Sequence, residues 1–244
     1  MTGFSCAGYK VDRSVNFWHP MGQTSDAKDR LLNSALKLMY ARSYGDVGVQ
    51  EICDHAGVKK GSFYHFFPSK RDLTLAAIDR QWEGVRQQVV KEVLTGTNSP
   101  LRRVERCLEL FYETQCGIKA RTGHVMGCPF GNLAIELSTQ DEYIRRKIDS
   151  IFQELAGYLE RTLEDAVAVG EAPKQDVRAT GQALVAFIQG ILLLAKSQND
   201  PQVIKRLGRG FVRSLAGEPT AITRASSSRP SATAGTASHL RSTR

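Results

Sequence analysis

Apolar residues recur at helical spacing along most of the chain, and no segment shows sustained alternation of apolar and polar positions. An early stripe covers two to three turns, and a later one holds a single helix face for several turns. The early stripe comprises Leu31, Leu32, Ala35, Leu38 and Met39, and the later one Ile144, Ile148, Ile151, Leu155, Leu159, Leu163 and Val167. This pattern predicts an all-α fold.

Clusters of glycine, proline and asparagine separate the predicted helices. A long helix is expected over 71–94, before the breakers that run from Gly96 to Pro100. Another is expected over roughly 175–197, and it is apolar around much of its circumference. Asn199 to Pro201 ends it, and a last helix is expected over 201–215.

The two ends of the chain lack any helical or strand period. Residues 1–23 are predicted to be a disordered extension. Residues 218–244 are rich in Ser, Thr, Ala and Arg and have no acid after Glu218, so they are predicted to be a disordered basic tail. Between these ends we expect two units, a small one over 24–72 and a larger helical one over 73–217.

The segment from Gly48 to Phe67 has the order of residues that a helix-turn-helix requires. Val49–Ala56 predicts a short first helix, and Gly57 stands where the chain must turn through a left-handed conformation. Val58 is the expected apolar plug between the two helices. A second short helix is expected over 61–67, followed by Pro68.

In a helix-turn-helix, the N-terminal end of the second helix enters the major groove. Lys59 and Lys60 stand at that end and can meet phosphate or a guanine edge. Phe63 and Phe66 or Phe67 are expected to pack inward, and Ser69 to cap the next helix. The predicted DNA-binding set is Val49, Lys59, Lys60, Gly61, Ser62, Tyr64, His65 and Lys70.

Charge and cysteine content restrict the predicted partners and cellular compartment only slightly. Lys plus Arg outnumber Asp plus Glu by 33 to 25, a net charge of +8, which is compatible with a polyanionic partner but does not identify one. The five cysteines are odd in number and widely spaced, so a reducing cytoplasm is expected. No long uninterrupted apolar run or signal peptide is evident, and no membrane association is expected.

We expect no metal site, cofactor or catalytic centre. The spacing of Cys107, Cys116, His124 and Cys128 fits no zinc pattern. The chain also lacks a phosphate-binding loop, a nucleophile elbow and an HExxH pair. A helical enzyme or carrier with a DNA-binding-like head remains the alternative, which the basic entrance at Lys59 and Lys60 disfavours.

The segment from Ile52 to Lys70 resembles the DNA-binding domain of the tetracycline-repressor (TetR) family. The similarity lies in Ala56-Gly57-Val58, in the run Lys60–Phe67, in Ser69-Lys70 and in the preceding Tyr44-Gly45 corner. The resemblance implies a dimeric repressor, released from operator DNA when a small-molecule effector enters a larger C-terminal domain. It also implies that the helices at about 175–197 and 201–215 form the homodimer.

The segment beginning Gly127-Cys128 is similar to a TetR subgroup that regulates detoxification of reactive electrophiles. There the cysteine after the glycine is the sensing thiol, which implies that Cys128 senses an electrophile or oxidant. A helix N-terminus would lower its pKa, whereas burial by Pro129 and Phe130 would raise it, so a structural role stays open. The predicted effector site comprises Cys128, Phe111, Tyr112, Phe130, Leu133 and Phe187.

Overall fold

The computed structural model describes residues 27–218, and within them every regular element is a helix. The prediction of an all-α fold is therefore confirmed. The residues 1–23, and all of the predicted tail except Glu218, lie outside this described part. In chain order the helices are α1 (Ala27–Ala41), α2 (Val49–Ala56), α3 (Lys60–Phe66), α4 (Lys70–Val85), η1 (Arg86–Leu94), α5 (Pro100–Thr122), α6 (Pro129–Leu137), α7 (Glu142–Ala168), α8 (Val177–Ser197) and α9 (Gln202–Leu215).

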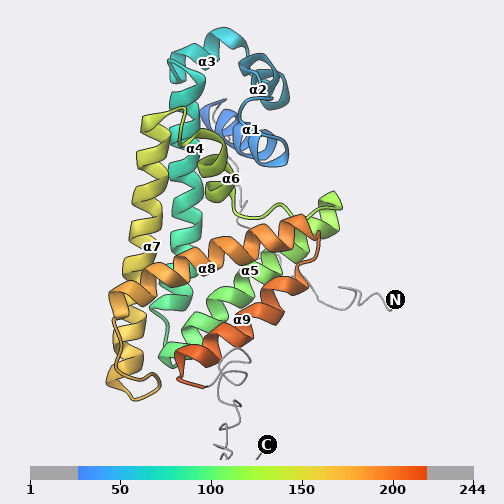
Figure 1. Cartoon of the computed structure of the whole chain (residues 1–244). Coiled ribbons are helices and arrows are strands. Elements are labelled where there is room, and N and C mark those ends of the chain that lie inside the picture. Colours follow the sequence, from blue (N-terminus) through green and yellow to red (C-terminus); the bar gives the residue numbers. More distant parts are fainter. Residues whose placement is uncertain (1–26, 219–244) are drawn as a thin grey trace, which may run out of the picture.

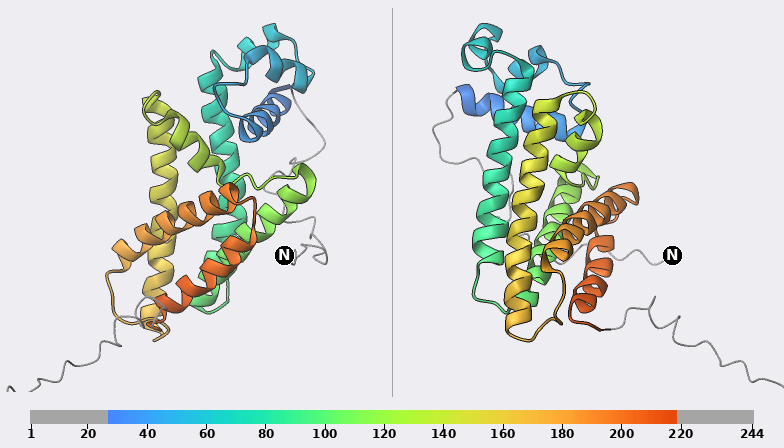
Figure 2. Two further views of the ribbon diagram at one scale, coloured as in Figure 1. Left: turned by 45° about the vertical axis from the view of Figure 1, so that its right-hand side comes forward. Right: turned by 60° about the vertical axis from the view of Figure 1, so that its left-hand side comes forward.

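Helices α1, α2 and α3 form a head at one end of the molecule, and α4 leads from this head into the helical body (Figure 1). Helix α7 lies beside α4 in Figure 1 and in the right view of Figure 2, and α8 crosses in front of α5 in Figure 1. The body is held mainly by packing of α7 on α8 and of α5 on α9.

Two separate hydrophobic clusters correspond to the head and the body. The head cluster includes Leu31, Ile52 and Phe63, each fully buried. The body cluster begins at Ile78, immediately after Ala77, the last buried residue of the head cluster. Helix α4 therefore contributes buried side chains to both cores and connects the head to the body.

The long helix predicted over 71–94 changes its hydrogen-bonding pattern part of the way along. It is α-helical to Val85 and continues as a π-helix over Arg86–Leu94, where the Thr95 N–H donates to the Val90 carbonyl at 2.9 Å. Buried residues on this stretch come in the pairs Val89–Val93 and Val90–Leu94. The four apolar side chains lie in the core at the i, i+4 spacing of an ordinary helix, and the change to a wider turn was not predicted from the sequence pattern.

The turn between α2 and α3 depends on a left-handed glycine, as predicted. Gly57 has φ 61° and ψ 40°, and its N–H donates to the Asp54 carbonyl at 3.2 Å. The next N–H, of Val58, donates to the Cys53 carbonyl at 3.0 Å, so the end of α2 is closed by two hydrogen bonds. Ser69 accepts from the Asp72 N–H and caps α4, which confirms the predicted cap.

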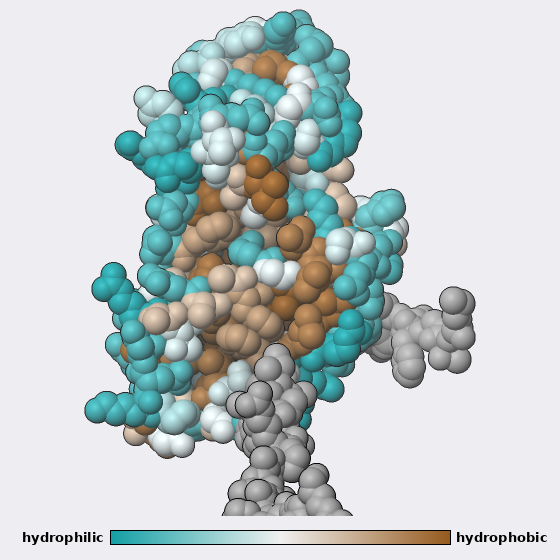
Figure 3. All heavy atoms as spheres, viewed as in Figure 1, coloured by the Kyte–Doolittle hydropathy of each residue, from teal (hydrophilic) through white to brown (hydrophobic). Residues whose placement is uncertain are grey.

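Helix α8 is the one helix within residues 27–218 that is long and apolar enough to cross a bilayer by length and composition. One face of it packs on α7 and α9. Its other face leaves Leu193 and Leu194 52% and 43% exposed. Leu207 of α9 is 38% exposed, and hydrophobic residues gather over part of the body on the face shown in Figure 3.

Replacing Gly57 with alanine should destabilise the protein by about 1–2 kcal/mol, because a side chain disfavours the left-handed conformation. No atom lies within 4 Å of a Cβ added there, so the cost is one of backbone conformation and not of a clash. Gly61→Ala is the matched control, since Gly61 is helical and equally uncrowded. Urea unfolding of both variants measures the difference; equal free energies of unfolding would contradict the conformational argument.

Candidate functional site

Helix α3 presents its polar residues to solvent and its aromatic residues to the head core. Phe63 is fully buried and Phe67 is 4% exposed, whereas the Tyr64 side chain is 51% exposed. Phe66 is half-buried, so Phe67 is the aromatic that joins Phe63 in the core. The outward face of α3 is thereby fixed by two rings that cannot rotate out without exposing the core.

The structure brings most of the predicted DNA-binding residues to one exposed end of the head. Lys59, Lys60, Gly61, Ser62 and His65 are all exposed at or along α3. Lys59 is the residue before the first turn of α3, and Lys60 begins it. Val49 is half-buried against the head cluster, where it supports α2 from its first turn.

Lys70 is predicted to contact the DNA backbone, and in this structure it contacts the loop between α1 and α2. Its ammonium group donates to the Tyr44 carbonyl and lies 3.9 Å from the centroid of the Tyr44 ring. Partial burial lowers the pKa of Lys70, although Glu136 and Asp46 act in the opposite direction. The side chain therefore joins the start of α4 to the loop between α1 and α2, and its contact with phosphate stays a prediction.

A largely apolar cavity with an empty volume of about 630 Å³ lies in the body. Three of the predicted effector-site residues line it, namely Cys128, Phe111 and Phe130. Trp82 of α4 meets Phe130 edge to face, with ring centroids 6.1 Å apart. The indole N–H of Trp82 donates to the Glu154 carboxylate on α7 at 2.9 Å, which fixes the ring as a wall.

Three other predicted effector residues face elsewhere. Tyr112 accepts from the Gln202 amide at 2.8 Å in a groove between α5 and α9, and Leu133 lies between α6 and the head. Phe187 stacks on Phe211, with ring centroids 4.0 Å apart. Tyr112, Leu133 and Phe187 therefore do not line this cavity.

Sequence reasoning missed several residues of the cavity wall. Aromatic and amide side chains from α1, α4, α5, α7 and α8 complete it, and they are Tyr40, Gln81, Trp82, Gln115, Phe152 and Gln189. Each one lies on a helix whose apolar face was recognisable. No local signal in the sequence shows that these faces converge on one space.

The start of α6 is held by hydrogen bonds from both the head and the body. The Gly127 carbonyl accepts from the Tyr40 hydroxyl of α1 at 2.5 Å and from the Gln115 amide of α5 at 3.0 Å. The Gln115 side-chain oxygen in turn accepts the N–H groups of Met126 and Gly127, both at 3.0 Å. Burial raises the pKa of the Tyr40 phenol, so the hydroxyl stays protonated and able to donate.

The far end of α6 is also bonded to the head. The Glu136 carboxylate accepts the backbone N–H of Tyr44 at 2.9 Å and that of Gly45 at 2.7 Å. Tyr44 and Gly45 lie in the loop that leads to α2, the first helix of the helix-turn-helix. Helix α6 therefore bridges the cavity and the head at both of its ends.

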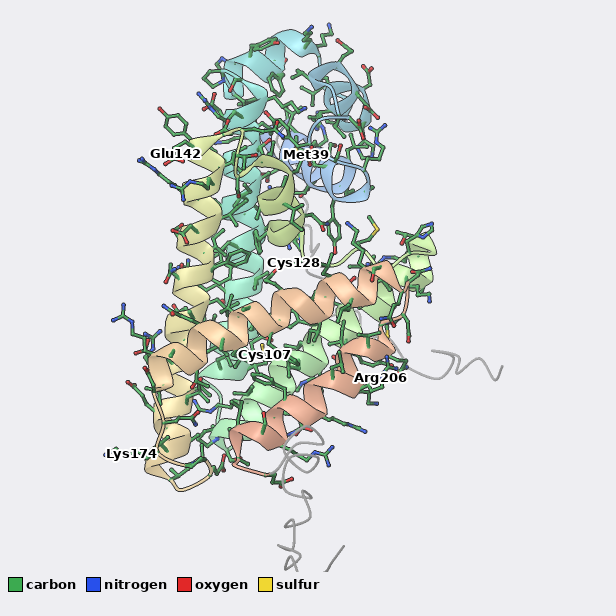
Figure 4. All side chains as sticks on the ribbon, viewed as in Figure 1. Met39, Cys107, Cys128, Glu142, Lys174 and Arg206 are labelled. Carbon is green, nitrogen blue, oxygen red and sulfur yellow. The ribbon has the colours of Figure 1, made fainter. Side chains whose placement is uncertain are left out.

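Cys128 lies at the N-terminus of α6 and is labelled in Figure 4. Its sulfur accepts the Gly131 N–H at 3.4 Å. Burial nevertheless raises the pKa of the thiol, and the hydrogen bonds from Gly131, Gln189 and Phe130 offset only part of that effect. Burial and the helix N-terminus were expected to have opposite effects on the pKa of Cys128. The increase caused by burial is the larger effect.

Cys128 also separates two spaces. It lines the cavity and, with Gly127, Phe152 and Gln189, a surface groove between α6 and α8. Gly131 is packed closely here, because a Cβ at this position would lie 2.6 Å from the Gln189 side-chain oxygen. A molecule that occupied the cavity would therefore touch the first turn of α6.

Comparison with known proteins agrees with this division into a head and a body. The family model described as "Bacterial regulatory proteins, tetR family" matches residues 31–77. The model described as "Tetracyclin repressor-like, C-terminal domain" matches residues 100–211. The two matches cover the helix-turn-helix and most of the helical body.

Curated relatives and solved structures extend this similarity. An HTH-type transcriptional regulator in the lacX 3′ region of Lactococcus lactis subsp. lactis is 31% identical over 180 residues, covering 74% of this chain and 88% of its own. The transcriptional regulator AcuR of Cereibacter sphaeroides is 30% identical over 188 residues, 77% of this chain and 84% of its own.

A regulatory protein TetR from Rhodobacter sphaeroides superposes with a TM-score of 0.70 at 29% identity, covering 78% of this chain and 98% of its own. The reduced form of E. coli NemR superposes with a TM-score of 0.69 at 23% identity, covering 78% and 97%. Both the local motif and the whole arrangement of helices lead to the same assignment. The chain belongs to the TetR family of bacterial DNA-binding transcriptional regulators.

Proposed function

We propose that the protein is a dimeric repressor whose head leaves its operator when a small molecule fills the cavity beside α6. The observation that carries this proposal is the double attachment of α6, to the cavity at Gly127 and Cys128 and to the head through Tyr40 and Glu136. The matched relatives are named as transcriptional regulators, and NemR and DhaR among them as repressors, which favours regulation over the enzyme or carrier alternative.

The head supplies the DNA contacts in this proposal. The exposed N-terminal end of α3, with Lys59, Lys60 and Ser62, enters the major groove, and Tyr64 and His65 reach phosphate oxygens. We assign the DNA-binding unit to 24–72 and the effector-binding and dimerisation unit to 73–217, with α4 continuous across the boundary. The protein acts in the cytoplasm, where operator DNA is accessible.

The α8 and α9 helices supply the homodimer interface in this proposal. Leu193, Leu194 and Leu207 leave an apolar surface that a second copy would cover. Gly190 and Gly210 have no atom within 4 Å of an added Cβ, so the helices of a partner can approach closely there. A two-fold dimer presents two heads to a palindromic operator, as helix-turn-helix repressors require.

The energies of the α6 contacts are sufficient for such a switch. A neutral hydrogen bond contributes about 1 kcal/mol and a charge-assisted one about 1.5–3 kcal/mol. The four neutral bonds of Tyr40 and Gln115 at one end contribute about 4 kcal/mol, and the two charge-assisted bonds of Glu136 at the other end about 3–6 kcal/mol. A shift from one dominant state to the other needs about 5.5 kcal/mol, so an effector must disturb both ends of α6 to release the head.

Reaction of Cys128 with an electrophile is a second candidate for the releasing event. The position of the sulfur in the walls of both the cavity and the surface groove favours it. The raised pKa of the thiol opposes it, because the thiolate is the nucleophile. Occupancy without a covalent bond is the form of the proposal that this chemistry supports best.

The DNA-binding assignment is tested by Lys60→Ala and Tyr64→Ala, each of which should weaken binding by roughly 5- to 100-fold. Binding is measured by fluorescence anisotropy with a DNA fragment from upstream of the protein's own gene. Lys174→Ala is the matched control, since it removes the same charge from an exposed lysine at the opposite end of the molecule (Figure 4). Affinities of the head variants equal to that of the control would overturn the assignment.

The state of Cys128 is tested by following its alkylation by N-ethylmaleimide against pH, with the modified peptide measured by mass spectrometry. Because the folded pKa is raised, the rate should be below that of glutathione at neutral pH and should still rise above pH 9.0, the ordinary cysteine value. Cys107, with its pKa raised to about 12 by burial, should stay unmodified and so reports unfolding. A rate that reaches its plateau below neutral pH would instead support the thiol-sensor candidate.

A further inference from the structure

The chemistry of the cavity wall restricts the effector that the proposed function requires, and the following inference rests on that function. No Asp, Glu, Lys, Arg or His stands among the residues that line the cavity. The nearby Glu154 is occupied by the Trp82 indole N–H. A carboxylate or ammonium ion would therefore lose its hydration on entry and gain no counter-ion in return. The cavity selects an uncharged molecule.

Aromatic rings make up much of the wall. Trp82 and Phe130 meet at an interplanar angle of 77°, and Phe111 and Phe152 contribute from α5 and α7. Rings that line a narrow space favour a flat aromatic occupant, by stacked or edge-to-face contacts. The empty volume of about 630 Å³ includes space open to solvent, so the chemistry of the wall restricts the ligand class more than the volume does. The small enclosed part of the cavity favours an occupant of no more than one or two rings.

Two neutral polar side chains in the wall can bond to a ligand. The Thr114 hydroxyl oxygen of α5 is buried and has no hydrogen-bond partner within residues 27–218. Gln81 of α4 is 4% exposed and lines the same cavity. A buried polar group without a partner costs free energy, and native interiors pair nearly all of them. A bound ligand can supply the missing partner.

We propose that the cavity binds an uncharged aromatic compound of one or two rings bearing a hydroxyl or carbonyl group, which hydrogen-bonds to Gln81 and Thr114. The rings lie among Trp82, Phe111, Phe130 and Phe152, against the first turn of α6. The neutral Gln81 amide and Thr114 hydroxyl favour a ligand with a polar substituent, and neither favours a charged ligand. Each can donate or accept, so both phenols and ketones satisfy them.

The charge requirement is tested with 2-naphthol and 2-naphthoate, which share a ring system and differ in charge at neutral pH. Isothermal titration calorimetry with the full chain should show binding of 2-naphthol, and binding of 2-naphthoate weaker by about 100-fold or more. Equal affinity for the two compounds, or tighter binding of the naphthoate, would overturn the inference.

The polar requirement is tested by Thr114→Val, which removes the hydroxyl and keeps the shape. It should weaken 2-naphthol binding by roughly 3- to 10-fold. Thr162→Val is the matched control, because that buried threonine bonds to the Tyr158 carbonyl within α7 and does not line the cavity. Thermal unfolding shows that both variants fold. An equal loss in both variants, or no loss in either, would contradict the role of Thr114.

The same experiments distinguish a wrong ligand class from a wrong proposal of repressor function. If the protein binds its promoter fragment but neither naphthalene compound binds to it, the ligand class is wrong and the repressor assignment stands. If the protein fails to bind the promoter fragment under any condition, the proposed function fails first. Release of the fragment by 2-naphthol and not by 2-naphthoate would support both.

Discussion

The arrangement of the molecule depends on one backbone carbonyl, that of Gly127, which accepts hydrogen bonds from the head and from the body at the same time. Tyr40 donates from α1 and Gln115 donates from α5. Gly127 has a φ of 74°, and an added Cβ would lie 3.3 Å from the Lys196 side chain, so only glycine fits comfortably. Where α6 begins is therefore determined jointly by the DNA-binding head and by the cavity wall.

Because the Gly127 carbonyl is bonded to both the head and the body, α6 connects these two parts of the family fold. Its first turn forms part of the cavity, and its last turn holds the loop before α2 through Glu136. Lys70 adds a third contact to that loop, from the start of α4. A movement of α6 would therefore reach the helix-turn-helix by short, polar contacts and not only through the packing of α4. Such coupling is reciprocal, so binding of DNA at the head must also affect the cavity.

Much of the head could be predicted from the sequence, because its signals are local. Gly57, Val58 and Ser69 each do what their position in the motif requires, and the bounds of α2 follow from them. The contact of Lys70 with the Tyr44 carbonyl could not be predicted, because the two residues are 26 positions apart. Nothing near Lys70 in the sequence distinguishes a lysine that reaches phosphate from one that ties two helices together.

The cavity was predicted less well, for a different physical reason. Apolar stripes identify which helices have a buried face, but the rotation of each helix decides whether Phe111 or Tyr112 points inward. The polar members of the wall, such as Gln81 and Gln115, interrupt those stripes and carry no local signal. For Cys128 the sequence supplied two opposing effects on the pKa, and only the surrounding side chains show that burial is the larger.

Hydrogen exchange of α6 with and without DNA tests the central claim, that α6 couples the cavity to the head, without requiring a known effector. Binding of the promoter fragment should slow exchange both in α3, the proposed DNA-contacting helix, and in α6, which lies away from the proposed DNA-contacting end. In the double variant Tyr40→Phe, Glu136→Gln the protection of α3 should remain and that of α6 should be lost. Protection of α3 with no change in α6 of the unaltered protein would contradict the account.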